Sequence, residues 1–391
     1  MNLKRLFVSI GIVLFLASPA LPQEPASSLE NEIKLGLGMR GALLTRRAEL
    51  TEGPEVEVSH KVFQRLLATS IAKRGDALPY RLTLFSGADV NAFSYAGGQV
   101  FAEGGIVQLL KDSPGLWAAV LGHEIGHAEL HHHYRAYVRQ VALQEQAEYY
   151  KRRAAAGDQS ANWALIGLGI GGSLLNLKLS RDEELEADRM GMFMMAEAGY
   201  HPDFAISCYR RIAFKMGDQS KASAFFADHP RWETREQRAL KAYEDALSVF
   251  QSRWGEVESS PGGAPPPIAS LNNITAEKDE PNKAAIITAL LNVRNAKGTE
   301  IIVQAEFYHD EKPVPAAIDA IDRHKSRRGY LWAGVLGHPH SSNETTTIEI
   351  RVPSAAIGIK QRKLKAYLVV FGPEEEVLQA SKEFNVSFPS K

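Results

Sequence analysis

Hydrophobic positions along the chain recur with a helical period over roughly the first 255 residues and alternate further on. Apolar side chains at helical spacing predict helices at 32–44, 58–72, 181–198, 204–216 and 234–250. Alternation at 81–85, and at 89–102 around the turn signal Gly97-Gly98, predicts a small sheet among these helices. Further strands are predicted at 285–293, 300–308, 348–352, 364–371 and 384–388. The pattern predicts an α+β chain, with a mainly helical first domain and a C-terminal β-sandwich.

One helix has a clear start. Ser113 suits an N-cap and Pro114 suits the first helical position. Apolar side chains from Leu116 to Ile125 give this helix a face to bury. The pattern predicts that it continues through His133 and toward Tyr150.

The chain divides into four parts on composition. Residues 1–22 resemble a signal peptide: Lys4 and Arg5 precede an apolar run, Leu6 to Ala17, which is short for a membrane span. An uncleaved anchor is the alternative. Residues 23–255 form the predicted first domain, 256–282 a Pro/Gly-rich linker and 283–391 the sandwich. We therefore expect an exported protein, located in the periplasm or, alternatively, outside the cell.

Charge and cysteine content narrow the classes of partner. The 391 residues include 45 basic and 46 acidic side chains, a formal net charge of -1, so nucleic acid is not an expected partner. Cys208 is the single cysteine, which excludes an intramolecular disulfide and an all-cysteine zinc site. The uncharged, glycine-containing segment Asn162 to Leu177 is either a buried element or a contact with a membrane or an envelope complex.

The sequence His123-Glu124-Ile125-Gly126-His127 carries the candidate chemistry. Residues four apart share one helix face, so the two imidazoles can hold one zinc ion. Glu124 then lies where it can take a proton from a zinc-activated water that attacks a carbonyl carbon. The motif alone is moderately specific, because it could also form a solvated helix face.

A catalytic zinc site needs a third protein ligand. The cluster His131 to His133 is one source, but on a continuous helix His133 lies about two turns beyond the metal. Glu184 is the other source, and Asp188, four residues later, can hydrogen-bond a ligand histidine. Taken alone, Glu184 and Asp188 are better explained as an acidic helix start favoured by the helix dipole.

These motifs, in this order, resemble the M48 peptidases. The resemblance includes Glu32 to Gly36, Asn91-Ala92-Phe93, His123 to His127, Glu184 to Asp188 and Asp228-His229-Pro230, and spans about residues 30–243. It implies a zincin-type domain in which His123, His127 and Glu184 bind one Zn2+ and Glu124 is the base. It also implies that Asn91 and Ala92 lie on a substrate-pairing strand and that His229 approaches the zinc, as a gate or a transition-state contact. A structural cap is the other role for His229.

The expected function is therefore that of a zinc metalloendopeptidase acting on unfolded or misassembled exported proteins in envelope quality control. The alternative is a zinc-binding chaperone or envelope assembly factor with gated or secondary proteolysis. A third hypothesis makes the C-terminal sandwich, whose partner the sequence does not identify, the main binding module.

Overall fold

The computed structural model describes residues 29–72, 78–158, 160–161, 179–216, 232–255, 261–310, 312–315, 332–373 and 377–389. The expected signal peptide, the segment Asn162 to Leu177 and His229 lie outside these described residues. No helix within the described ranges is both long enough and apolar enough to cross a membrane.

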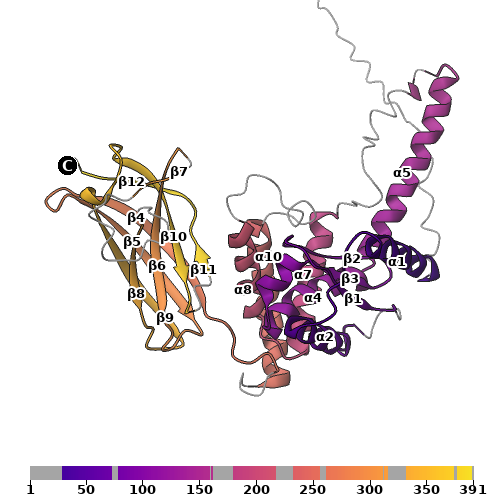
Figure 1. Ribbon diagram of the computed structural model, residues 1–391, viewed down its shortest axis with the longest axis horizontal. Coiled ribbons are helices and arrows are strands. Elements are labelled where there is room, and N and C mark those ends of the chain that lie inside the picture. Colours follow the sequence, from indigo (N-terminus) through magenta and orange to yellow (C-terminus); the bar gives the residue numbers. More distant parts are fainter. Residues whose placement is uncertain are drawn as a thin grey trace, which may run out of the picture.

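Two lobes with separate cores make up the described chain (Figure 1). The first lobe is mainly helical, and the second consists of strands and one short 3-10 helix, η3 (Ser354–Ala356), which confirms the predicted α+β class. The helices of the first lobe are α1 (Leu29–Leu44), α2 (Pro54–Leu67), α3 (Gly104–Leu110), α4 (Pro114–Glu129), α5 (His132–Ala155), α7 (Arg181–Glu197), α8 (Asp203–Met216) and α10 (Trp232–Trp254).

A three-stranded sheet in the first lobe has the order β1-β3-β2, formed by β1 (Arg81–Leu84), β2 (Ala92–Tyr95) and β3 (Gln99–Ala102). Strands β2 and β3 are antiparallel and meet at Gly97 and Gly98, whose φ values of 71° and 74° are the left-handed conformation that glycine permits. Strand β2 stands at the edge of this sheet and packs against α4. The predicted position of the turn is therefore confirmed.

Two sheets form the second lobe and share one apolar core. Their inward-facing positions alternate with outward ones, as in β5 and β6, where every second residue is buried. The strands are β4 (Ile268–Asp279), β5 (Ala284–Arg294), β6 (Ile301–His309), β7 (Lys312–Pro313), β8 (Trp332–Gly337), β9 (Asn343–Pro353), β10 (Lys363–Phe371), β11 (Val377–Ala380) and β12 (Phe384–Ser387).

The predicted linker, 256–282, is too long. Strand β4 occupies Ile268–Asp279 and pairs along its length with β5. After its first residues β4 is mostly exposed or half-buried, so its polar side chains resemble those of a linker. Backbone pairing across the sheet, which composition does not reveal, makes this segment a strand.

The long helix predicted from residue 113 through 133 is also wrong, because the structure divides it into α4 and α5. Helix α4 ends at Glu129, and His131 has a left-handed φ of 54°. The Nδ1 atom of His131 lies 2.7 Å from the Oε2 atom of the buried Glu32 of α1. This contact, between residues 99 positions apart, lies at the point where the chain turns into α5, which projects from the lobe (Figure 1).

Candidate metal centre

Helix α4 supplies two of the expected ligands and packs along α7, which supplies the third. Both helices begin with residues that stabilise a helix N-terminus. Pro114 opens α4, and Ser180 and Glu183 form a reciprocal capping box at α7. The Ser113 side chain makes no capping hydrogen bond, although Ser113 does hold the predicted N-cap position.

Small residues bring the two helices close together. Gly122 and Gly126 face α7, where Ala187 and Gly191 face α4. A Cβ atom on Gly126 would lie 2.9 Å from the carbonyl oxygen of Ala187, closer than a side chain tolerates. This close approach places the first turns of α7 beside the His-Glu-x-x-His segment.

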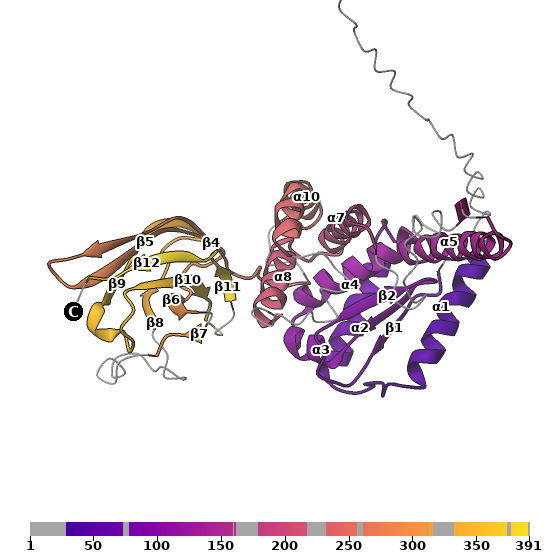
Figure 2. The same cartoon turned by 90° about the horizontal axis from the view of Figure 1, so that it is seen from above.

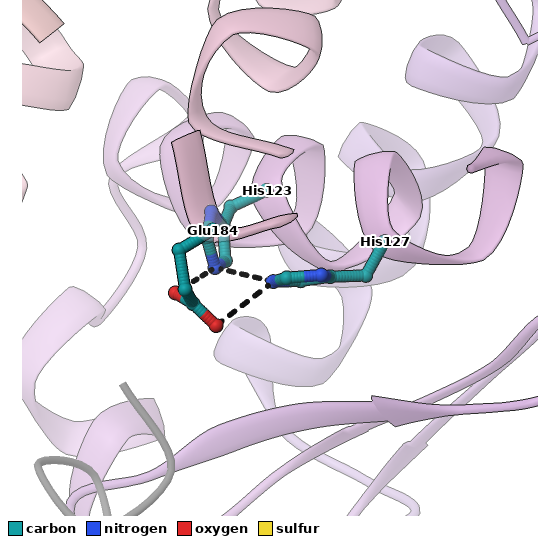
Figure 3. A group of neighbouring side chains, drawn as sticks. All are labelled: His123, His127 and Glu184. Carbon is teal, nitrogen blue, oxygen red and sulfur yellow. Dashed lines mark hydrogen bonds and ion pairs between the residues drawn. The ribbon is translucent and has the colours of Figure 1, made fainter. Parts of the chain in front are cut away.

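Three buried side chains converge at this contact, as Figure 3 shows. The Nε2 atoms of His123 and His127 are 3.0 Å apart, and the Glu184 carboxylate lies 3.7 Å from the first and 3.5 Å from the second. Ligands about 2.0–2.1 Å from a tetrahedral zinc stand about 3.3 Å from one another. The donor set and its spacing therefore fit a single zinc ion.

The other predicted site residues within the described part of the chain are also buried. Glu124 is buried on α4, between the two histidines in sequence. The Oδ1 atom of Asp188 lies 2.8 Å from His123 Nδ1, the type of contact expected from its spacing, and accepts a hydrogen bond from the Tyr209 hydroxyl of α8 at 2.9 Å. Asn91 and Ala92 are buried at the start of edge strand β2.

The position of His133 differs from the one expected on a continuous helix. Because the chain turns at His131, the His133 ring centroid lies 5.5 Å from that of His127 rather than about two turns away. Among the described residues, however, the cluster with metal-ligand spacing contains His123, His127 and Glu184 and not His133.

The sequence indicates His132 only as part of the candidate ligand cluster His131 to His133 and does not predict its contact with His127. It is fully buried, and its Nδ1 lies 2.9 Å from His127 Nδ1. Burial lowers the pKa of His132 below its ordinary value and outweighs the hydrogen bond with Glu186, which acts in the opposite direction. The lowered pKa favours a neutral imidazole near pH 7. Only the helix break at His131 brings this ring back to the site, and no local sequence signal marks that break.

A His-Glu-x-x-His helix facing a buried glutamate is the donor arrangement of a metallohydrolase. The family model described as peptidase family M48 matches residues 57–243, which include all of these side chains. This region of the chain belongs to peptidase family M48.

Named relatives agree with this assignment. The mitochondrial metalloendopeptidase OMA1 of Schizosaccharomyces pombe is 32% identical over 171 residues, which are 44% of this chain and 48% of that protein. Metalloprotease LoiP of Escherichia coli is 28% identical over 172 residues, 44% of this chain and 66% of LoiP. A putative beta-barrel assembly-enhancing protease of Vibrio cholerae is 28% identical over 167 residues, 40% of this chain and 33% of that protein. The similarity to OMA1 and LoiP thus spans less than two thirds of their length.

Proposed function

We propose that the chain is a zinc metalloendopeptidase with a zincin-type catalytic domain. The convergence of His123, His127 and Glu184 in one buried cluster is the observation that carries this proposal. The names of the relatives, metalloendopeptidase and metalloprotease, support the class of reaction.

His123 and His127 would hold the ion through Nε2, and Glu184 through its carboxylate. Bound zinc supplies a Lewis acid that lowers the pKa of a coordinated water to about 7. The Glu124 carboxylate would take the proton from the attacking water and deliver it to the leaving amine. Its burial strengthens the electrostatic interactions that this transfer requires.

Strand β2 would position the substrate. It is one of the two edge strands of the small sheet and packs against α4, which carries His123 and Glu124. An extended polypeptide can add to such an edge through its backbone, so that side-chain sequence matters little. Because only an extended segment can pair in this way, unfolded or misassembled polypeptides are the proposed substrates.

Export to the bacterial envelope, and a role there in quality control, are part of the proposal. The basic start at Lys4 and Arg5 followed by the apolar run Leu6 to Ala17 supports export. The beta-barrel assembly-enhancing protease among the relatives supports envelope proteins as the substrate class.

Metal analysis combined with cleavage of an unfolded protein such as casein tests the proposal. The parent protein should hold about one zinc ion per chain and cleave casein. Glu124→Gln should keep its zinc and lose about 10²–10⁴ in rate, since glutamine cannot take the proton. Parent protein that binds zinc and prevents aggregation of unfolded protein without cleaving it would instead indicate the chaperone alternative.

A further inference from the structure

The two histidines of the cluster are supported in different ways. The Nδ1 atom of His123 faces a carboxylate, Asp188, at 2.8 Å. The Nδ1 atom of His127 faces another imidazole, that of His132, at 2.9 Å. The contact between the two imidazoles requires that one Nδ1 carries a proton and the other does not. Each imidazole offers both a donor and an acceptor only in its neutral form.

The proton order follows from the metal site on which this inference rests. If His127 ligates through Nε2, its proton is on Nδ1, and this N–H can donate only to an unprotonated Nδ1 of His132. His132 then carries its own proton on Nε2, which lies 3.2 Å from Glu186 Oε2. Both hydrogen bonds therefore run in one direction, from His127 to His132 and from His132 to Glu186.

Helix α7 supplies a carboxylate to each of these two arrangements. Glu184, Glu186 and Asp188 lie at alternate positions of its first two turns. Glu184 joins the cluster, Asp188 contacts His123 and Glu186 contacts His132. His132 is fully buried and Glu186 is largely exposed, so the chain of contacts leads from the metal cluster to the protein surface.

We propose that His132, oriented by Glu186, is a positioning residue that fixes the tautomer and the ring orientation of metal ligand His127. A hydrogen-bond acceptor at Nδ1 of a ligand histidine raises the basicity of the coordinating nitrogen and restricts ring rotation. The left-handed turn at His131 is what places His132 in this position.

The test measures zinc affinity of the full chain by competition with a chromophoric chelator, in four variants beside the parent. His132→Leu keeps a side chain of similar size but removes the acceptor. His132→Gln restores both functions, since its amide oxygen can accept from His127 and its amide NH2 can donate to Glu186. Glu186→Ala removes the outer partner, and Asp182→Ala removes an exposed carboxylate of the same helix as the control. Thermal unfolding of the zinc-free forms measures the integrity of the fold.

His132→Leu should weaken zinc binding about 10–100-fold, and Glu186→Ala about 10-fold. The unfolding temperature of the zinc-free proteins should change much less than the zinc affinity. His132→Gln should recover most of the loss, and Asp182→Ala should bind like the parent. Parent-like affinity in His132→Leu, or a His132→Gln as weak as His132→Leu, would overturn the proposal. If His132→Leu does not fold, Glu186→Ala decides, and equality with Asp182→Ala overturns it. A parent protein without zinc would refute the proposed function itself, a distinct result.

Discussion

Gly122 of α4 and Gly191 of α7 touch backbone to backbone. A Cβ atom on Gly191 would lie 2.6 Å from both the carbonyl carbon of Gly122 and the amide nitrogen of His123. The separation of the two helices, and with it the reach of Glu184 to the histidines, therefore depends on the absence of side chains at this crossing.

Gly191→Ala should push α7 away from α4. Both contacting groups are backbone and cannot rotate aside, so we expect a loss of about 1–3 kcal/mol in stability, as for other overpacked contacts. Zinc affinity should fall as well, because Glu184 moves with α7. Denaturant unfolding and chelator competition measure the two effects. Gly38→Ala is the control and should be neutral or stabilising, because nothing beyond the neighbouring backbone of α1 lies within 4 Å of the added Cβ. Parent-like stability and affinity in Gly191→Ala would show that the crossing has room to relax.

Glu197, at the end of α7, should contribute stability that depends on pH. Burial raises its pKa, but hydrogen bonds from the Ser70 amide and hydroxyl and the nearby Arg253 guanidinium outweigh burial and hold the pKa below the ordinary 4.5. A carboxyl with a lowered folded-state pKa stabilises the protein above its unfolded pKa, and this stability is lost as the pH falls through the folded-state value.

Glu197→Gln should therefore cost about 1.5–3 kcal/mol at pH 7, the range for hydrogen bonds to charged groups. The difference in unfolding free energy between variant and parent should shrink below pH 4.5. Urea unfolding across this pH range measures it, with the exposed Glu57→Gln as a control expected to change stability by less than about 0.5 kcal/mol. A difference that is the same at all pH values would contradict the stated cause.

The lobes are joined through a buried carboxylate. Asp203, the first residue of α8, accepts hydrogen bonds at 2.7 Å from Arg294, at the end of β5, and from Asn295. Arg210 of the same helix donates to the carbonyl oxygens of Ala269 and Leu378 in the second lobe. Helix α8 also carries Tyr209, whose hydroxyl reaches Asp188, so it connects the lobe contact with the metal cluster.

Arg294→Ala should weaken this junction by about 1–3 kcal/mol, because the buried Asp203 loses a charged partner. Calorimetry should then resolve unfolding of the lobes into more widely separated transitions. Lys363→Ala, on an exposed position of β10, is the control and should leave the transitions unchanged. Unfolding transitions in Arg294→Ala that match those of the parent would contradict a role for the Arg294–Asp203 contact in joining the lobes.

How much of this structure the sequence predicts depends on the range of the contacts involved. The helical period located α7 and α8, and glycines located the β2–β3 turn, because local spacing and φ preference determine these features. The end of α4 depends instead on the contact between His131 and Glu32, which a local pattern cannot contain. The same limit hid β4, whose exposed residues resemble a linker.

The site residues likewise divide into those that local spacing predicts and those whose positions depend on distant contacts. Spacing alone placed His123 beside His127 and Glu184 beside Asp188, since each pair lies four residues apart on one helix. That the two pairs meet was implied by the order of motifs and depends physically on the Gly122–Gly191 crossing. The sequence indicates His132 only within the cluster His131 to His133, as a source of the third ligand, because its position beside His127 follows from the turn at His131.

The most direct test of the central claim is the zinc content and zinc affinity of purified Glu184→Ala, measured beside Asp182→Ala and His133→Ala. Asp182 is an exposed carboxylate in the same first turn of α7, and His133 lies near His127 without belonging to the metal cluster. The structure predicts that Glu184→Ala loses its zinc while the other two variants retain it. Zinc that remains in Glu184→Ala, or that is lost with His133→Ala instead, would contradict the assignment of Glu184 as the third ligand.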